Sequence, residues 1–337
     1  MVGQVRAADD VVAVSLTERT ALHPGWIPLV APVSLLVPGM GNLIQGDRAT
    51  AKTMLWTGGA SFAVALGGAA LVALTGAGDI PTAFGVPIAM VGVSSFFSLG
   101  ITSAIGAFSA DGEAFHPLLL KDAWNSRLRT GVTLGGAPRA GWPGDYSVSL
   151  FGEYRAERWS LMLEGGYLPV EPDGWLNATA GVRLLNYTAA VPRAGLWLEG
   201  GVQREWMGRL GFDDTRLRLQ LVSTLPMGLI SGRFGKVTTQ LRAGIDPTWT
   251  RYRGNGAVDF ELTFSGGFDV RYSLHEYVRP FVGYEHSRNG LLGGTGTGFL
   301  GTFYGGVEVL LPQDLVVSAR GLVGTPNGFF ATVEWRH

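Results

Sequence analysis

The chain has 337 residues, 26 basic and 27 acidic side chains, a net charge of −1 and no cysteine. The balanced charge excludes a basic nucleic-acid-binding surface, and the lack of cysteine excludes thiolate metal sites, cysteine nucleophiles and disulfides. With 51 glycines, 16% charged and 11% aromatic residues, the composition is typical of a protein in lipid.

Residues 1–10 show no basic start followed by an apolar run, so no signal peptide is visible. The sequence around Ala7 and Ala8 is compatible with a cleavage-site remnant. We therefore expect that the chain begins near a processed end or that its true start lies upstream, and that 1–25 form a periplasmic segment.

An apolar helical region is expected over 26–120. Residues 53–78 and 80–110 contain no charged side chain, and each is longer than the ~20 residues that a helix needs to cross a bilayer core. Small residues recur at four-residue spacing, which predicts close helix packing. They are Gly59, Ala63 and Gly67 in the first stretch, and Ser94, Ser98, Thr102 and Gly106 in the second. A membrane hairpin is favoured over two buried helices of a soluble core.

Ahead of this hairpin, residues 26–46 are apolar but broken by three prolines, which predicts a short or re-entrant segment rather than one straight helix. Its centre, Pro38-Gly39-Met40-Gly41, resembles the start of small bacterial membrane-hairpin domains of unknown function. The resemblance covers 38–75 and implies membrane residence.

From 121 to 337 the pattern changes to strict alternation. Apolar residues at 258, 260, 262, 264, 268 and 270 face one way, and polar residues at the intervening positions face the other. About twelve such segments follow one another, each near the ~10 residues of a tilted transmembrane strand. Because an open sheet edge would leave unpaired backbone groups in lipid, we expect a closed antiparallel barrel. The alternative is a soluble β-sandwich, which the aromatic residues repeated near strand ends disfavour.

Connection lengths set the expected orientation. Short turns are expected at Ala156–Glu157, Ser273–Glu276 and Leu311–Gln313, and long loops at Ala137–Gly144, Pro247–Gly256 and Ser287–Gly298. In outer-membrane barrels the short turns face the periplasm. Both ends of the barrel chain would then lie on the periplasmic side.

The last strand, Gly328 to Trp335, resembles the terminal signal by which the barrel-assembly machinery recognises its clients. The resemblance implies a bacterial outer-membrane protein that contacts this machinery during biogenesis. Arg336 and His337 follow the aromatic residue that usually ends the signal, which leaves its placement open.

If apolar side chains face lipid, charged side chains of both signs line the lumen. The expected lining residues are Glu164, Arg183, Glu199, Arg216, Arg218, Arg242, Asp259, Glu261, Asp269, Arg271, Arg279, Glu308, Arg320 and Glu334. The mixture is compatible with a barrel closed by ion pairs and equally with an open pore. No ring of one sign indicates a selectivity filter.

Residues 284–290 resemble the His-x-Ser-Asn motif of lipid A deacylases and, more loosely, the site of outer-membrane phospholipase A. This resemblance implies His286 as base, Ser287 as nucleophile and Asn289 as orienting residue. In those families one residue separates histidine and serine, whereas here they are adjacent and would point to opposite faces of a strand. A polar loop start is therefore favoured.

The five histidines lack zinc-ligand spacing, so we expect no metal and no cofactor. The sequence predicts a porin-like, non-enzymatic outer-membrane barrel, either structural or a narrow diffusion channel, in contact with membrane lipid and lipopolysaccharide. Its helices are expected to support self-association into a homo-oligomer. The alternative is an outer-leaflet lipid hydrolase that uses His286.

Overall fold

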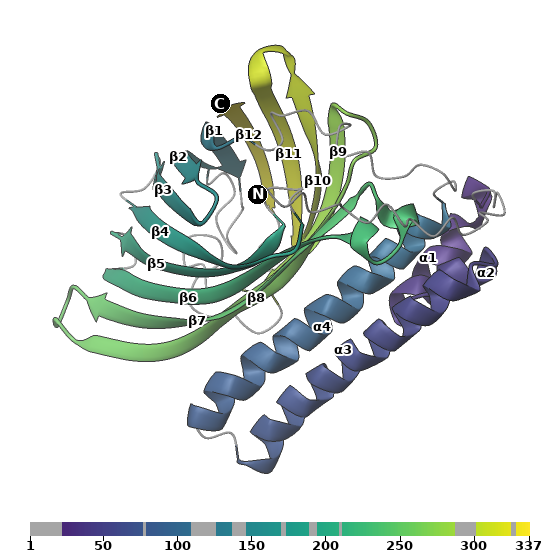
Figure 1. Cartoon of the computed structure of the whole chain (residues 1–337). Helices are drawn as coiled ribbons and strands as arrows, with labels where there is room; N and C mark the ends of the chain where they lie inside the picture. The colour runs from purple at the N-terminus through teal and green to yellow at the C-terminus, as the bar shows by residue number, and fades with distance from the viewer. Residues whose placement is uncertain are drawn as a thin grey trace, which may run out of the picture.

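The computed structural model describes residues 22–76, 79–108, 126–136, 146–169, 173–188, 194–208, 211–286, 301–324 and 328–337. It consists of a β-barrel and a group of helices that lies against the outside of the barrel wall (Figure 1). The helices come first in the chain and the barrel strands follow.

Twelve antiparallel strands close into one barrel, because β1 pairs with both β2 and β12. The strands are β1 (Leu128–Gly136), β2 (Tyr146–Arg155), β3 (Trp159–Leu168), β4 (Asp173–Asn186), β5 (Gly195–Met207), β6 (Phe212–Pro226), β7 (Val237–Tyr252), β8 (Val258–Tyr272), β9 (Val278–His286), β10 (Thr302–Leu311), β11 (Leu315–Gly324) and β12 (Gly328–Arg336). The predicted fold class and strand number are confirmed, and the sandwich alternative is wrong because the sheet closes on itself.

The outer face of the barrel is apolar, as the alternation predicts. Leu150 and Leu163 are more than half exposed, and Phe260 is 60% exposed, whereas Asp269 on the opposite face of β8 is 2% exposed. So much leucine and phenylalanine on the outside is stable only against lipid tails.

One connection differs from its prediction. Residues Pro247–Gly256 were expected to form a long loop, but β7 continues through Pro247 to Tyr252. Pro247 pairs in register with Leu262 of β8, while the register between β6 and β7 is interrupted at this point. Proline has no N–H to donate, so it interrupts pairing on one side of the strand without ending the strand.

The helices are α1 (Ile27–Leu36), α2 (Met40–Ile44), α3 (Arg48–Leu74) and α4 (Asp79–Ala107), after a 3-10 turn at Pro24–Trp26. The broken start over 26–46 thus forms two short helices. Both α3 and α4 are long and apolar enough to cross a membrane. Helix α3 begins at Arg48 rather than at 53, because the Asp47 side chain accepts a hydrogen bond from the Thr50 N–H and caps the helix.

Helices α3 and α4 pack at backbone contact through small residues. A Cβ placed on Gly92 would lie 2.6 Å from the carbonyl oxygen of Ser61, and one on Gly85 would lie 2.8 Å from that of Gly68. The stripe Gly59, Ala63, Gly67 lies on another face of α3, exposed and away from α4. The neighbouring face of α3 is equally rich in small residues and is the one that α4 covers. A packing partner for the stripe of Gly59, Ala63 and Gly67 therefore stays a prediction.

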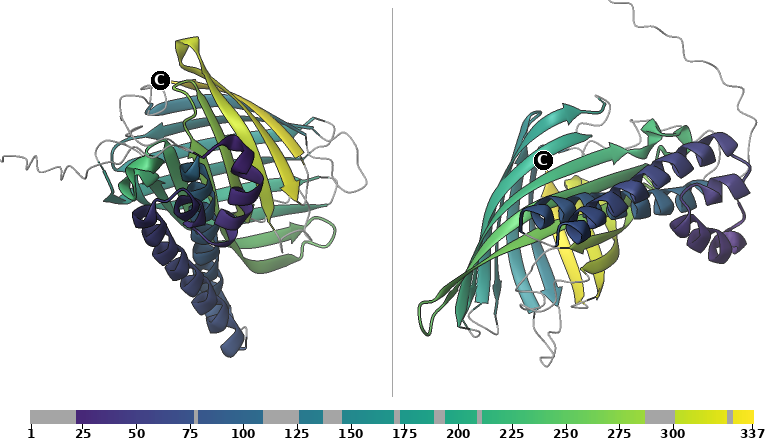
Figure 2. Two further views of the ribbon diagram at one scale, coloured as in Figure 1. Left: turned by 90° about the vertical axis from the view of Figure 1, so that its right-hand side faces the viewer. Right: turned by 90° about the horizontal axis from the view of Figure 1, so that it is seen from below.

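Helix α4 lies along the outer faces of β7 and β8 (Figures 1 and 2). Met90 lies over Gly266 of β8, and Ile101 and Ile105 pack into an apolar cluster with Phe268 and Val270. Ser94, Ser98 and Thr102 are at most 2% exposed, and their spacing places Ser94 and Ser98 on the side of α4 that carries Met90 and Ile101. The helices therefore cover part of the barrel wall and do not plug the lumen.

The connection between β6 and β7 joins the two parts. It contains two 3-10 turns, Met227–Leu229 and Gly232–Phe234. Arg233 Nε lies 3.1 Å from a carboxylate oxygen of Asp47, and the hydroxyls of Ser231 and Thr50 are 3.1 Å apart. The start of α3 is thus fixed to one end of the barrel.

Candidate functional site

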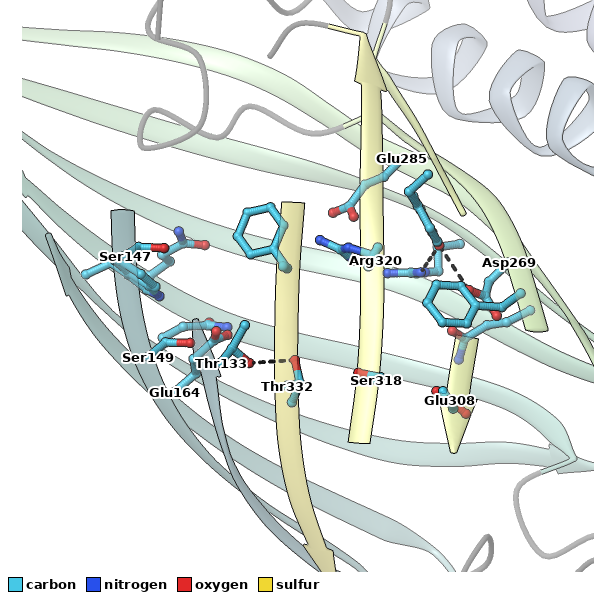
Figure 3. Close-up of a pocket in the computed structure, with 18 of the residues that line it drawn as sticks. Thr133, Ser147, Ser149, Glu164, Asp269, Glu285, Glu308, Ser318, Arg320 and Thr332 are labelled. Carbon is cyan, nitrogen blue, oxygen red and sulfur yellow. Dashed lines mark hydrogen bonds between the residues drawn. The ribbon is translucent and has the colours of Figure 1, made fainter. Parts of the chain in front are cut away.

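A cavity of about 500 Å³ lies inside the barrel (Figure 3). Every strand contributes at least one lining side chain, so the cavity occupies the shared lumen. The polar and charged lining residues are Thr133, Tyr146, Ser147, Ser149, Glu164, Asn177, Gln203, Arg216, Arg218, Gln240, Arg242, Asp269, Arg271, Glu285, Tyr304, Glu308, Ser318, Arg320 and Thr332. The apolar and aromatic ones are Leu168, Trp175, Phe281 and Phe330.

The residues that the sequence assigns to the lumen fall into three groups. Those on the cavity wall are Glu164, Arg216, Arg218, Arg242, Asp269, Arg271, Glu308 and Arg320. Four more do not line this cavity but contact other inward-facing side chains: Arg183, Glu199, Arg279 and Glu334. Asp259 and Glu261 are exposed and do not line the cavity, because β8 extends beyond it at this end.

The charges on one side of the lumen form a continuous network. Arg271 lies 2.6 Å from Asp269 and 3.0 Å from Glu308, and Arg279 lies 3.2 Å from the other oxygen of Glu308. Arg242 reaches the hydroxyl of Tyr304, which also lies 3.1 Å from Asp269. Arginine forks that bridge two carboxylates fix side chains across strands β8, β9 and β10.

A second network lies where β1, β2 and β12 meet. Arg129 contacts Glu153 and lies 3.4 Å from Glu334, while Arg336 lies 2.6 Å from Glu334. Arg155 also contacts Glu153. The contact between Arg129 and Glu334 crosses the seam at which β1 and β12 close the barrel, so the network stabilises closure as well as fills the lumen.

On the opposite wall the ion pairs are longer. Arg218 lies 3.6 Å from Asp246, and Arg216 lies 3.7 Å from Glu205. Beyond them Leu168, Met207 and Phe212 pack with Trp175 into a buried apolar cluster. The lumen is therefore narrowed by apolar side chains at this end and by charged side chains further along.

Aromatic residues inside the lumen were missed by the sequence prediction. The guanidinium of Arg320 lies 5.0 Å from the ring centre of Tyr304 and 5.3 Å from that of Phe330. Such stacking holds a guanidinium in place without a carboxylate. Their positions in the alternation could have indicated this, because Tyr304 shares a strand face with the lumenal residue Glu308, and Phe330 shares a strand face with Glu334.

Removal of Arg271 is expected to destabilise the barrel by about 3 kcal/mol, because Asp269 and Glu308 would remain in the lumen without their main counter-charge. The measurement is the free energy of unfolding of Arg271→Ala in urea. Arg253→Ala removes a solvent-exposed pair with Asp213 and should lower the free energy of unfolding far less, because water screens this pair. Equal stability of the two variants would contradict a structural role for the network.

The residues of the hydrolase alternative are not brought together in the described part of the chain. Ser287 and Asn289 lie outside the described residues. His286 is the last residue of β9 and pairs in register with Gly266 of β8. Its position in the alternation places it on the outer face with Tyr284, while Glu285 faces the cavity.

No protein-family model matches the sequence, and no curated protein matches it. Among solved structures, the chain is similar in fold to the KdgM porin, with a TM-score of 0.41 and 10% identity over 62% of this chain and 99% of that one. It is also similar to Acinetobacter baumannii Omp33, with a TM-score of 0.36 and 7% identity over 63% of this chain and 98% of that one. The translocator domain of the autotransporter NalP from Neisseria meningitidis matches with a TM-score of 0.36 and 15% identity over 63% of this chain and 89% of that one.

A closed antiparallel barrel with a polar interior and an apolar outer face defines the class of protein. Closure satisfies every strand edge, which is the condition for a sheet to span lipid. Single-chain barrels with an even strand number are characteristic of bacterial outer membranes. The protein is a bacterial outer-membrane β-barrel with a helical hairpin packed against its outer wall.

Proposed function

We propose that the protein is a narrow diffusion channel for small ions and polar solutes. The observation that carries this proposal is the lumenal cavity of about 500 Å³ with its polar and charged lining. A barrel with only a structural role has no need of such a space, since its lumenal ion pairs could fill it. The ion-pair networks narrow the lumen around this cavity, so we expect a passage narrower than that of a wide porin.

The lining charges suggest weak ion selectivity. Carboxylates and guanidinium groups both border the cavity, and several are paired with each other. A strongly selective pore would place one sign at its constriction. Arg320, held between two rings, adds a positive charge to the cavity from β11 (Figure 3). Because the other lining charges are of both signs, we expect small anions and cations to pass at comparable rates.

The test is single-channel recording of the full chain in a planar bilayer. Phe330 lines the cavity, while the adjacent Phe329 is 57% exposed on the outer face. Phe330→Ala should roughly double the unitary conductance by widening the lumen, whereas Phe329→Ala should leave it unchanged. The two variants delete the same side chain from opposite faces of one strand.

Absence of channel events from the wild type and from Phe330→Ala would overturn the proposal and leave a structural barrel. Equal conductance changes in the two phenylalanine variants would also contradict it, because they would trace to barrel distortion. Heat-modifiable migration on gels should first show that each variant is folded.

A further inference from the structure

A second concave site lies outside the barrel, on the membrane-facing surface of the helices. It is a groove of about 510 Å³ along the start of α3 beside α2. The lining residues are Leu43, Arg48, Ala51, Lys52, Leu55, Trp56 and Gly59. Two cations thus share a groove with an apolar floor, and the channel proposal uses neither.

The positive charge of this groove is not neutralised by neighbouring acids. Arg48 and Lys52 are four residues apart on α3, which puts both on one helix face, and both are exposed. The nearest acid in the sequence is Asp47, whose carboxylate accepts a hydrogen bond from the Thr50 N–H and pairs with Arg233 instead. Within the described residues no ion pair involves Arg48 or Lys52.

The residues of α3 are those expected where lipid headgroups meet the apolar core. The uncharged stretch of α3 starts directly after Lys52, and Trp56 is 73% exposed, as interfacial tryptophans are. The start of α3 contacts the β6–β7 connection, at the barrel end that also carries the turns after β2, β8 and β10. Those three turns are shorter than the β6–β7 connection beside them, and short turns of outer-membrane barrels face the periplasm, so we place this end there.

We propose that this groove binds a phospholipid with an anionic headgroup in the periplasmic leaflet. The headgroup phosphate lies between the guanidinium of Arg48 and the ammonium of Lys52, and an acyl chain runs along Leu55 and Trp56. A Cβ on Gly59 would meet no atom within 4 Å, so the groove is open where this chain would pass. Basic side chains at a membrane surface attract anionic lipid in this way.

The test is native mass spectrometry of the full chain in mild detergent, titrated with phosphatidylglycerol. Arg48→Gln/Lys52→Gln should weaken binding about thirtyfold, at ~1 kcal/mol for each cation removed. Gly59→Leu should also weaken it by filling the groove without changing the charge. Phosphatidylcholine should bind the wild type more weakly than phosphatidylglycerol does.

The matched control is Arg204→Gln/Arg251→Gln, which removes two exposed cations at the opposite barrel end. This control should retain phosphatidylglycerol. Equal loss in both double variants would overturn the proposal, since binding would follow total charge. Unchanged binding of phosphatidylglycerol by Arg48→Gln/Lys52→Gln would also overturn the proposal. The same holds if this variant lost bound lipopolysaccharide but kept phosphatidylglycerol.

Discussion

Gly68→Leu is expected to separate α3 from α4. A Cβ on Gly68 would lie 2.5 Å from the carbonyl oxygen of Gly85 and would overlap the backbone nitrogen of Ala89. These are backbone atoms of a facing helix and cannot rotate away, so the helices must move apart along much of their contact. Overpacking of this kind costs about 3 kcal/mol, with loss of the surrounding close contacts.

The neighbouring glycine provides the control. Gly67 meets no atom within 4 Å, so Gly67→Leu adds the same side chain on the lipid-facing side of the same turn. The measurement is thermal unfolding followed by the helical circular dichroism signal, with the barrel signal recorded in parallel. Gly68→Leu should lower the helical midpoint, and Gly67→Leu should leave it near the wild type. If Gly67→Leu were the more damaging change, the exposed stripe would be the packing face.

That pair of glycines also explains why the helix interface was only partly predictable. Two stripes of small residues run along α3, one through Gly59 and Gly67 and one through Ser61 and Gly68. Both satisfy the spacing for close packing, so periodicity alone cannot say which faces a partner. The choice depends on the crossing angle of α3 on α4, which is a tertiary property.

The barrel was more predictable because its constraint is local. Every strand alternates between lipid and lumen, so each segment carries its own signal whatever its neighbours are. Pro247 misled the prediction, because proline usually ends a strand. It is accommodated here since one side of β7 keeps its pairing with β8 while the pairing with β6 is interrupted.

The charged side chains that line the lumen could be predicted from the sequence, whereas the apolar ones could not. Asp269, Arg271 and Glu308 follow the parity rule, and they meet across three strands in the structure. Phe330 breaks the expectation that apolar side chains face lipid, because its ring stacks on Arg320 inside the barrel. Cross-strand partners of this kind depend on register, which no single strand reveals.

Phe234→Ala is expected to release the helices from the barrel wall. Phe234 has no exposed surface and packs in one cluster with Met54 of α3, Leu99 of α4 and Val270 of β8. Its ring also lies against Gly106, where an added Cβ would lie 2.8 Å from the ring carbon Cδ1. Deleting a fully buried phenylalanine costs about 3–5 kcal/mol, and this cost falls on the contact between the two parts.

The readout can be a disulfide, because the chain has no cysteine of its own. A Cβ on Gly266 would lie 3.4 Å from the Cβ of Met90, which is close to the separation in natural disulfides. Met90→Cys/Gly266→Cys should therefore cross-link α4 to β8 on mild oxidation. Adding Phe234→Ala should slow this reaction at least several-fold.

Leu229→Ala is the matched control, since Leu229 lies in the same connection and is 54% exposed. It should leave cross-linking unchanged. An unchanged rate in Phe234→Ala would mean that the contact of α4 with β7 and β8 alone holds the helices. A slowed rate would instead make the connection between β6 and β7 the main attachment, because it provides both the buried ring and the Arg233 contact with Asp47.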